Sequence, residues 1–189
     1  MHMDKVVKFD FSNFEHKSLL FVAFNFNKKW LRDDSLHTPD EFYESLKNNV
    51  LNGKDELFIY YVCNEPYGYV YLDFDRFNNI TIHASTISNG NIFKSARILK
   101  NVVDYCFKKK QANKVKIGTL VYQHLAEIIA KYVGFKKEGL LKDEITINGK
   151  SVSRLILAIT KKDYKNLVQR SKKELLEIIK KVTQNVKER

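Results

Sequence analysis

Residues 91–97 have the types expected of an anion-binding helix start. They follow a polar loop and open a run with helical spacing, so their first N–H groups would lack partners within the helix. Those groups and the positive end of the helix dipole attract phosphate, and Lys94, Ser95 and Arg97 could add a cation and a hydroxyl. The alternative is an ordinary helix start with Lys94 and Arg97 in solvent.

His83 is a second residue suited to chemistry. It lies in residues 79–87, where alternation predicts a β-strand that puts Thr81, His83, Ser85 and Ile87 on one face. An imidazole has an unperturbed pKa near ~6.5, so His83 could act as a general base close to neutral pH. A histidine on a half-buried strand is more often structural, so both roles stay open.

The sequence shows no pattern for metal or nucleotide chemistry. The five histidines and two cysteines lack the spacing of metal ligands, and no metal is expected. The G-x-S-x-G, Walker A and dinucleotide patterns are absent. Cys63 and Cys106 stand far apart, which favours free thiols in a reducing compartment.

Periodicity and turn signals predict the elements that position these residues. Short connections among the strands expected within residues 56–87 imply antiparallel neighbours, and Asn148-Gly149 is typical of a type I′ hairpin turn. The predicted fold is α/β (α+β), a mixed, mostly antiparallel sheet of about 6–7 strands with helices on both faces. Helices are expected at residues 16–31, 38–51, 93–110 and 123–133, and strands at 6–11, 56–63, 67–74, 79–87, 115–121, 135–147 and 151–160.

Two of these helices carry specific signals. The second has a strong start, with a threonine cap at Thr38, Pro39 at the first helical position and acids in the first turn. It should stop near Gly53. The first helix is expected to bury its apolar stripe, which consists of Leu19, Leu20, Val22, Ala23, Phe26 and Trp30.

Composition places the chain among globular proteins. It has 189 residues, 44% hydrophobic and 29% charged, enough for one domain with a core. The formal charge of +11 would attract polyanions, although a lysine-rich background is the favoured explanation. No apolar run approaches the ~20 residues that span a bilayer, and no signal peptide is recognisable, so a cytoplasmic protein with no membrane partner is expected.

An ordered set of residues then carries a family resemblance. Gly134-Phe135, Glu138-Gly139 and Gly149 follow the helix expected at residues 123–133. On the predicted order β-α-α-β-β-β-α-β-α-β-β, this set resembles the GNAT acetyltransferases, and most closely the branch that acetylates ribosomal-protein N-termini and small amines. Gln123 and Ala126 stand where that branch carries Asn and Ser. Gly134 is expected to cap the helix in the αL conformation, with Phe135 in the core.

The resemblance implies acetyl-CoA as co-substrate. Its diphosphate would lie on the helix start after the fourth strand, where the family pattern is Gln/Arg-x-x-Gly-x-Gly/Ala. A lysine in place of the first glycine could narrow the approach of phosphate to the backbone, or could supply a cation. Main-chain groups before that helix would hold the pantetheine arm, where a β-bulge usually splays the fourth and fifth strands. The implied cofactor-binding residues are Thr86, Ile87, Ser88, Asn91, Ile92, Phe93, Lys94, Ser95, Ala96, Arg97 and Gln123.

Acetyl transfer to an amine also needs a base and an acid. The resemblance places His83 where a base could face the cleft. Tyr122, beside Gln123 near the expected CoA sulfur, could protonate the thiolate, or could be a core or rim residue. The position of the usual serine acid holds Ala126, and solvent could instead carry both protons.

The function expected from this resemblance is an acetyl-CoA-dependent N-acetyltransferase acting on a primary amine of a protein or small molecule. The alternative is a catalytically degenerate GNAT-fold protein that binds a partner protein, CoA or nucleic acid. Nucleic acid is the less favoured partner, because the strand aromatics alternate as packing residues do. A homodimer is left open.

The last residues extend beyond the resemblance, which assigns residues 1–164 to a GNAT-like domain and 165–189 to an added basic amphipathic helix. Ser171 and Glu174 match the sequence pattern of a capping box. The apolar stripe could dock on the domain, on a second copy or partner, or on RNA or a membrane surface. That stripe consists of Leu175, Ile178, Ile179, Val182 and Val186.

Overall fold

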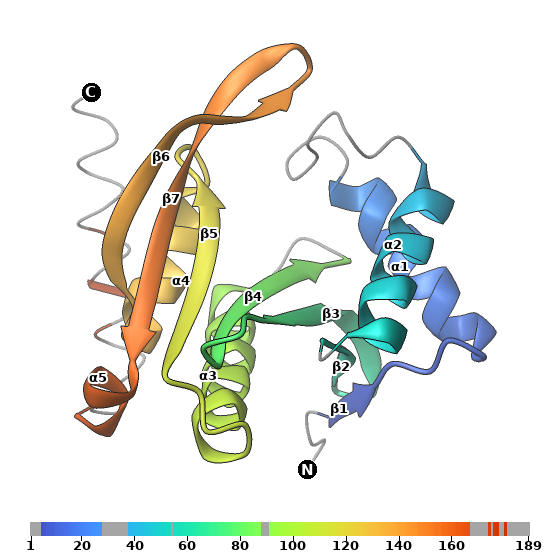
Figure 1. The fold of residues 1–189 in the computed structure, drawn as a ribbon, viewed down its shortest axis with the longest axis horizontal. Helices are drawn as coiled ribbons and strands as arrows, with labels where there is room; N and C mark the ends of the chain where they lie inside the picture. The colour runs from blue at the N-terminus through green and yellow to red at the C-terminus, as the bar shows by residue number, and fades with distance from the viewer. Residues whose placement is uncertain are drawn as a thin grey trace.

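Seven strands form one mixed sheet in the part of the chain that the computed structural model describes, residues 5–27, 38–53, 55–87, 91–166, 174, 176, 177 and 180 (Figure 1). The strand order is β1-β2-β3-β4-β5-β7-β6, and only β4 and β5 are parallel. This confirms the predicted mixed, mostly antiparallel sheet. The strands are β1 Lys5–Lys8, β2 Glu56–Val62, β3 Glu65–Phe74, β4 Asn79–Thr86, β5 Lys114–Leu120, β6 Lys136–Ile147 and β7 Lys150–Thr160.

Helices cover both faces of the sheet, as predicted. One core lies between the sheet and α1 and α2, and another between the sheet and α3 and α4 (Figure 1). A short helix that was not predicted, α5, follows β7, and its Tyr164 ring stacks on Phe107 at 4.5 Å. The helices are α1 Phe14–Asn27, α2 Pro39–Asn52, α3 Ile92–Lys108, α4 His124–Val133 and α5 Lys161–Lys165.

The helix starts follow from their caps. Thr38 is the N-cap of α2, as predicted, and it forms a capping box with Glu41, since each side chain accepts the other's backbone N–H. Helix α1 begins earlier than expected because Asn13 Oδ1 accepts the N–H of Glu15 at 2.8 Å.

Helix α1 buries a narrower stripe than the sequence analysis predicts. Leu20 and Ala23 are buried, but Val22 is 50% and Phe26 42% exposed, so the expectation of burial was wrong for these two. At about 100° per residue, both fall away from the stripe that faces the sheet. Trp30 lies outside the described residues.

The junction after α4 has the expected geometry. Gly134 adopts φ 112° and ψ 3°, and its N–H points to the carbonyls of Ala130 and Lys131, as in a left-handed C-cap. Phe135 is buried, and the β6–β7 turn uses positive φ at Asn148 and Gly149.

The β2–β3 turn differs from the expected one, which began at Asn64. Cys63 and Asn64 form it, with φ of 55° and 66°. Pro66 lies within β3, opposite Tyr61, where the register with β2 shifts after Tyr60. A proline is tolerated at such an irregular position because no ladder hydrogen bond requires its N–H. Cys63 and Cys106 are free thiols, as expected.

Strands β4 and β5 part from one another. They pair from Asn79 with Lys114 only as far as Ile82 with Ile117, although both strands continue (Figure 1). Strand β4 keeps an unbroken register with β3 through Thr86. The splay therefore begins inside a strand of regular register with β3. The bulge was expected at residues 88–90, which lie outside the described part.

Candidate functional site

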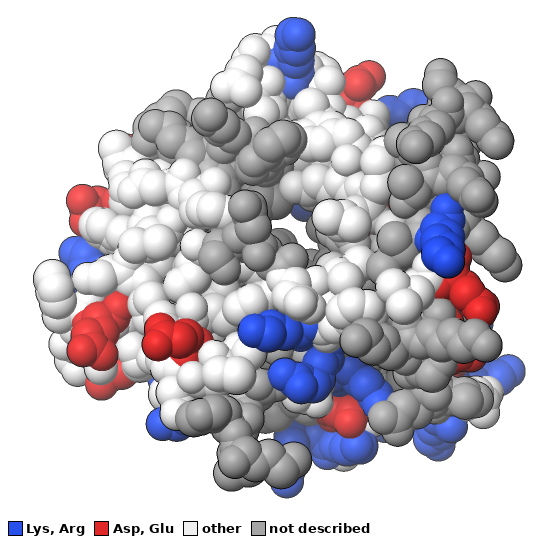
Figure 2. Space-filling view, turned by 180° about the vertical axis from the view of Figure 1, so that it is seen from behind, with Lys and Arg blue, Asp and Glu red and all other residues white. Residues whose placement is uncertain are grey.

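An opening passes through the molecule between the parted strands (Figure 2). His83 and Ala84 are exposed although they lie within β4, and so is Gly118 on β5. Residues inside a sheet are exposed in this way when the neighbouring strand has moved aside. The splay thus connects the α1–α2 face of the sheet with the α3–α4 face.

The backbone of β4 turns polar groups toward this opening. The N–H of Ile87 donates to Tyr67 O on β3 at 3.0 Å. Because successive residues of a strand point their N–H and C=O groups in opposite directions, those of Ala84 and Thr86 point away from β3, toward the side that β5 has left. Of the predicted cofactor residues, Thr86 therefore points its backbone N–H and C=O groups toward the opening. The N–H of Ile87 is hydrogen-bonded to β3 within the sheet. Ser88 lies outside the described residues.

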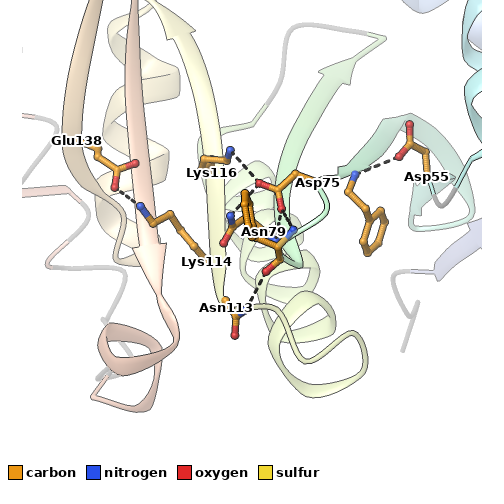
Figure 3. A network of polar contacts seen from close by, with 9 residues as sticks. Asp55, Asp75, Asn79, Asn113, Lys114, Lys116 and Glu138 are labelled. Atoms are coloured by element: carbon orange, nitrogen blue, oxygen red, sulfur yellow. Dashed lines mark hydrogen bonds and ion pairs between the residues drawn. The ribbon is translucent and has the colours of Figure 1, made fainter.

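A polar network holds together the closed end of the splay, which is the end where β4 and β5 are still paired (Figure 3). Asp75 Oδ1 accepts the N–H of Phe77 at 2.8 Å and of Asn79 at 2.9 Å. The side-chain amide of Asn113, just before β5, donates to Phe77 O at 2.8 Å. Lys116 of β5 lies 3.9 Å from Asp75 Oδ2. The β3–β4 turn is thereby joined to the start of β5, which holds together the end where the two strands are paired.

His83 lies on the wall of the opening that faces α1 and α2. It pairs with Tyr71 across β3 and β4, and the two ring centroids are 5.6 Å apart at 41°. The residue is open to solvent at the splay, yet protein surrounds its ring closely. This burial lowers the pKa of His83, against the opposing negative charge of Asp73, so the imidazole is neutral near neutral pH.

The start of α3 is capped by its own side chain. Asn91 Oδ1 accepts the N–H of Phe93 at 3.0 Å and of Lys94 at 3.2 Å. The Tyr67 hydroxyl donates to Asn91 O at 3.2 Å and lies 3.1 Å from Ser95 Oγ. These amides were predicted to face a diphosphate, but in the structure they are bonded within the chain, and an anion would have to displace the cap.

The other predicted cofactor residues on α3 divide into two groups. Ile92, Phe93 and Ala96 pack with Ile128 of α4, so they contribute to the core. Lys94 is half-buried and Arg97 exposed in the first turns of the helix. These two cations are the side chains of this segment that could meet a phosphate.

The start of α4 holds Tyr122 and Gln123. Gln123 Oε1 accepts the N–H of Leu120 at 3.1 Å and the Thr119 hydroxyl at 3.2 Å, so its amide oxygen closes the end of β5. Tyr122 is 40% exposed, and partial burial raises the pKa of its hydroxyl. It is therefore protonated at neutral pH, as a proton donor must be.

Tyr71 and Arg154 act on His83 but were not among the predicted site residues. Tyr71 could have been found, because an antiparallel register pairs it with His83. Arg154 could not, since it comes from β7 and lies over Gly118 of β5. A Cβ atom built on Gly118 would be 2.9 Å from Arg154 Cδ. Arg154 Nη2 donates to Glu144 Oε1 at 2.6 Å.

Two absences hold for the described part of the chain. No group of three or more His, Cys, Asp or Glu side chains is arranged to hold a metal ion there. Among the helices described, none is long and apolar enough to cross a membrane.

Several solved structures have the same fold. A spermidine N-acetyltransferase SpeG chimera from Vibrio cholerae and hSSAT has a TM-score of 0.72 at 17% identity, covering 87% of this chain and 99% of that one. The V. cholerae spermidine N-acetyltransferase in complex with CoA and spermine has a TM-score of 0.71 at 16% identity, covering 86% and 98%. Mycobacterium smegmatis RimJ in complex with CoA-disulfide has a TM-score of 0.68 at 18% identity, covering 83% and 81%.

No protein-family model matches the sequence, and neither does any curated protein. The structural matches nevertheless extend over most of the chain in each case. With identities of 16–18%, they establish the architecture: this chain has the fold of the GNAT acetyltransferases.

Proposed function

We propose that the protein is an acetyl-CoA-dependent N-acetyltransferase acting on a primary amine. The observation that carries this proposal is the opening between β4 and β5, which has His83 on its wall. An acyl-CoA bound on the α3–α4 face could present its thioester there to an amine arriving from the α1–α2 face. The CoA complexes of two structural neighbours support the choice of co-substrate.

In this proposal the chain holds the co-substrate mainly through its backbone and two cations. Lys94 and Arg97 would contact the diphosphate at the start of α3. Backbone groups of β4 at Ala84 and Thr86 would hydrogen-bond the pantetheine arm where β5 has moved away. The cap on α3 costs affinity, because displacing such a cap requires about 1 kcal/mol.

The transfer itself forms a C–N bond and breaks a C–S bond. The amine nitrogen attacks the thioester carbonyl and its proton passes to the neutral imidazole of His83, directly or through water. The departing thiolate takes a proton from Tyr122 or from water. Positioning both reactants in one opening supplies a large share of the rate.

The acceptor is proposed only as a class, a primary amine on a protein or a small molecule. Spermidine is the acceptor named for the V. cholerae neighbours. A panel that includes spermidine, single amino acids and peptides with free N-termini would separate small amines from protein N-termini.

A second candidate function is favoured by one observation, the Asn91 cap on the amides of Phe93 and Lys94. A chain that no longer binds diphosphate would gain stability from such a cap. In that case the fold would serve to bind a partner rather than to transfer an acetyl group.

Calorimetry with acetyl-CoA distinguishes the two. We expect binding in the micromolar range that is weakened about tenfold or more by Lys94→Glu, because a charge-assisted phosphate contact contributes roughly 1.5–3 kcal/mol. Lys109→Glu, which makes the same charge change at the far end of α3, should bind normally. The absence of binding would favour the partner-binding function. Where binding is seen, CoA release with the amine panel tests for transfer.

A further inference from the structure

The hydroxyl of Tyr71 is held at two points. It donates to Asp55 Oδ2, and the side chain of Asn49 also hydrogen-bonds it. Asp55 is fixed in turn, because its Oδ1 accepts the N–H of Phe74 at 3.1 Å. The ring is 8% exposed and belongs to the core beneath α1 and α2. Tyr71 is therefore anchored at its tip as well as along its ring.

This anchored ring is the side-chain surface against which His83 rests. The two residues are directly opposite in the β3–β4 register, with ring centroids 5.6 Å apart. On the other side of His83 the ladder with β5 has ended, since its last pair is Ile82 with Ile117. The ring contact of the imidazole is with Tyr71 of β3, on the side of β4 that stays paired.

The charges that act on His83 come from three elements. Asp73 of β3 and Asp55 of the α2–β2 connection favour the protonated imidazole, whereas Arg154 of β7 opposes it together with burial. The Asp55 carboxylate accepts the Tyr71 hydroxyl, so one residue both fixes Tyr71 and acts electrostatically on His83.

We infer that Tyr71 is a positioning residue for His83, and that Asp55 keeps Tyr71 in place. Tyr71 holds the imidazole toward the opening and limits its contact with water. The catalytic consequence rests on the proposed function, since the held imidazole is the base of that reaction. The structural relationship does not depend on it and can be measured separately.

Two substitutions should move the pKa of His83 in opposite directions. Tyr71→Phe removes the hydroxyl that donates to Asp55. The His83 ring then gains access to water, and the Asp55 carboxylate acts more strongly on that ring. Both effects raise the pKa. Asp55→Asn keeps an oxygen that can accept from Tyr71 but removes the negative charge, which lowers the pKa. We expect shifts of about half a unit or more.

The chain offers a matched control on the opposite face of the sheet. The Tyr105 hydroxyl donates to Glu56 Oε2 at 2.9 Å, which is the same kind of tyrosine–carboxylate bond. Tyr105 belongs to α3 and packs on Phe58. Tyr105→Phe therefore removes an equivalent bond without touching His83.

The experiment is an NMR titration of the His83 Cε1–H in the full chain, with the resonance identified by its loss in His83→Gln. Opposite shifts in Tyr71→Phe and Asp55→Asn, with none in Tyr105→Phe, support the inference. Shifts in the same direction, or shifts no larger than those in Tyr105→Phe, overturn it. Should Tyr71→Phe fail to fold, the Asp55→Asn variant still tests the inference. A His83 pKa in Asp55→Asn equal to that in the unmodified chain overturns the inference.

A second measurement, of acetyl transfer, distinguishes failure of the proposed function from failure of the positioning role of Tyr71. If the chain releases CoA with an amine, the acid limb of kcat/KM should follow the same opposite shifts. If it shows no transfer, the proposed function fails while the titration still decides whether Tyr71 positions His83.

Discussion

The side-chain oxygen of Asn91 accepts the backbone N–H of Lys94 at 3.2 Å, so this amide at the start of α3 is already bonded. The N–H of Phe93 shares the same acceptor at 3.0 Å. A diphosphate that used these two amides would have to displace the Asn91 side chain. Since such a cap is worth about 1 kcal/mol, the displacement weakens binding about fivefold.

We therefore predict that Asn91→Gly strengthens acetyl-CoA binding about fivefold, because glycine leaves the two amides open. Its cost in stability should be at most about 1 kcal/mol. Calorimetry measures the affinity and thermal unfolding the stability. Thr38→Gly is the control, since it removes the side-chain cap of α2, away from the opening. Unchanged or weaker binding would mean that the cap and the co-substrate do not compete.

Gly68 is required by the close approach of β3 and β4. A Cβ atom at this position would lie 2.1 Å from the backbone oxygen of Ser85 and 3.0 Å from Thr86 Cα. Gly68→Ala forces the two backbones apart and should lower the free energy of unfolding by about 2 kcal/mol or more. It should also disturb the wall of the opening, because Ser85 and Thr86 follow His83.

Gly139 provides the control for this substitution. It lies in β6 of the same sheet, and a Cβ atom there would meet nothing within 4 Å. Gly139→Ala should leave the midpoint of urea unfolding nearly unchanged. Equal effects of the two substitutions would show that the close approach of β3 to β4 does not limit stability.

Asp75 should stabilise the closed end of the splay in a pH-dependent way. Its side-chain bond with Asn79 lowers the pKa of Asp75, with smaller contributions from the N–H groups of Phe77 and Asn79. A carboxyl with a lowered pKa stabilises the fold above its ordinary pKa of ~3.9, and this contribution is lost as pH falls below that value. Asp75→Ala should cost about 1–2 kcal/mol at neutral pH.

Urea unfolding of Asp75→Ala at pH 7 and at pH 3 tests this, with Asp40→Ala as the control. Asp40 is exposed on α2 and pairs only loosely with Lys17, at 3.4 Å. The difference between Asp75→Ala and the unmodified chain should shrink at the lower pH. A difference that is the same at both pH values would contradict a role for the ionised carboxylate.

Much of the fold could be predicted because its signals are local. The N-cap at Thr38, the left-handed cap at Gly134 and the positive φ of Asn148 and Gly149 each depend on a few adjacent residues. The burial of α1 was predicted less well, since the width of its buried stripe depends on how the helix lies on the sheet. Val22 and Phe26 show this, because both are apolar and neither their type nor their neighbours in the sequence indicate that they are exposed.

The candidate site was less predictable because its parts come from distant elements. The sequence identified His83 and the start of α3, but the splay that exposes His83 depends on where pairing with β5 ends. Whether Asn91 caps its helix or leaves the amides open is a choice between two conformations of one side chain. Arg154 comes from β7 and crosses Gly118 of β5, where a Cβ atom would lie 2.9 Å from Arg154 Cδ.

The pH dependence of the proposed reaction should report on the charges around His83. Burial lowers the pKa of His83, so the rise of kcat/KM with pH that depends on this base should have its midpoint below the ordinary pKa of ~6.5. Asp73→Asn removes a charge that favours the protonated ring, so it should move the acid limb to lower pH. Arg154→Gln removes a charge that opposes protonation and should move the limb to higher pH.

The measurement is kcat/KM from pH 5 to pH 8 for acetyl transfer to an amine that can saturate the enzyme. Asp40→Asn is the charge-matched control. The control should leave the acid limb in place, because its carboxylate lies on the exposed face of α2. His83→Gln should abolish the limb. If the limb stays while His83 is absent, the titrating group is another residue, or solvent takes the amine proton, and His83 has only a structural role in the splay.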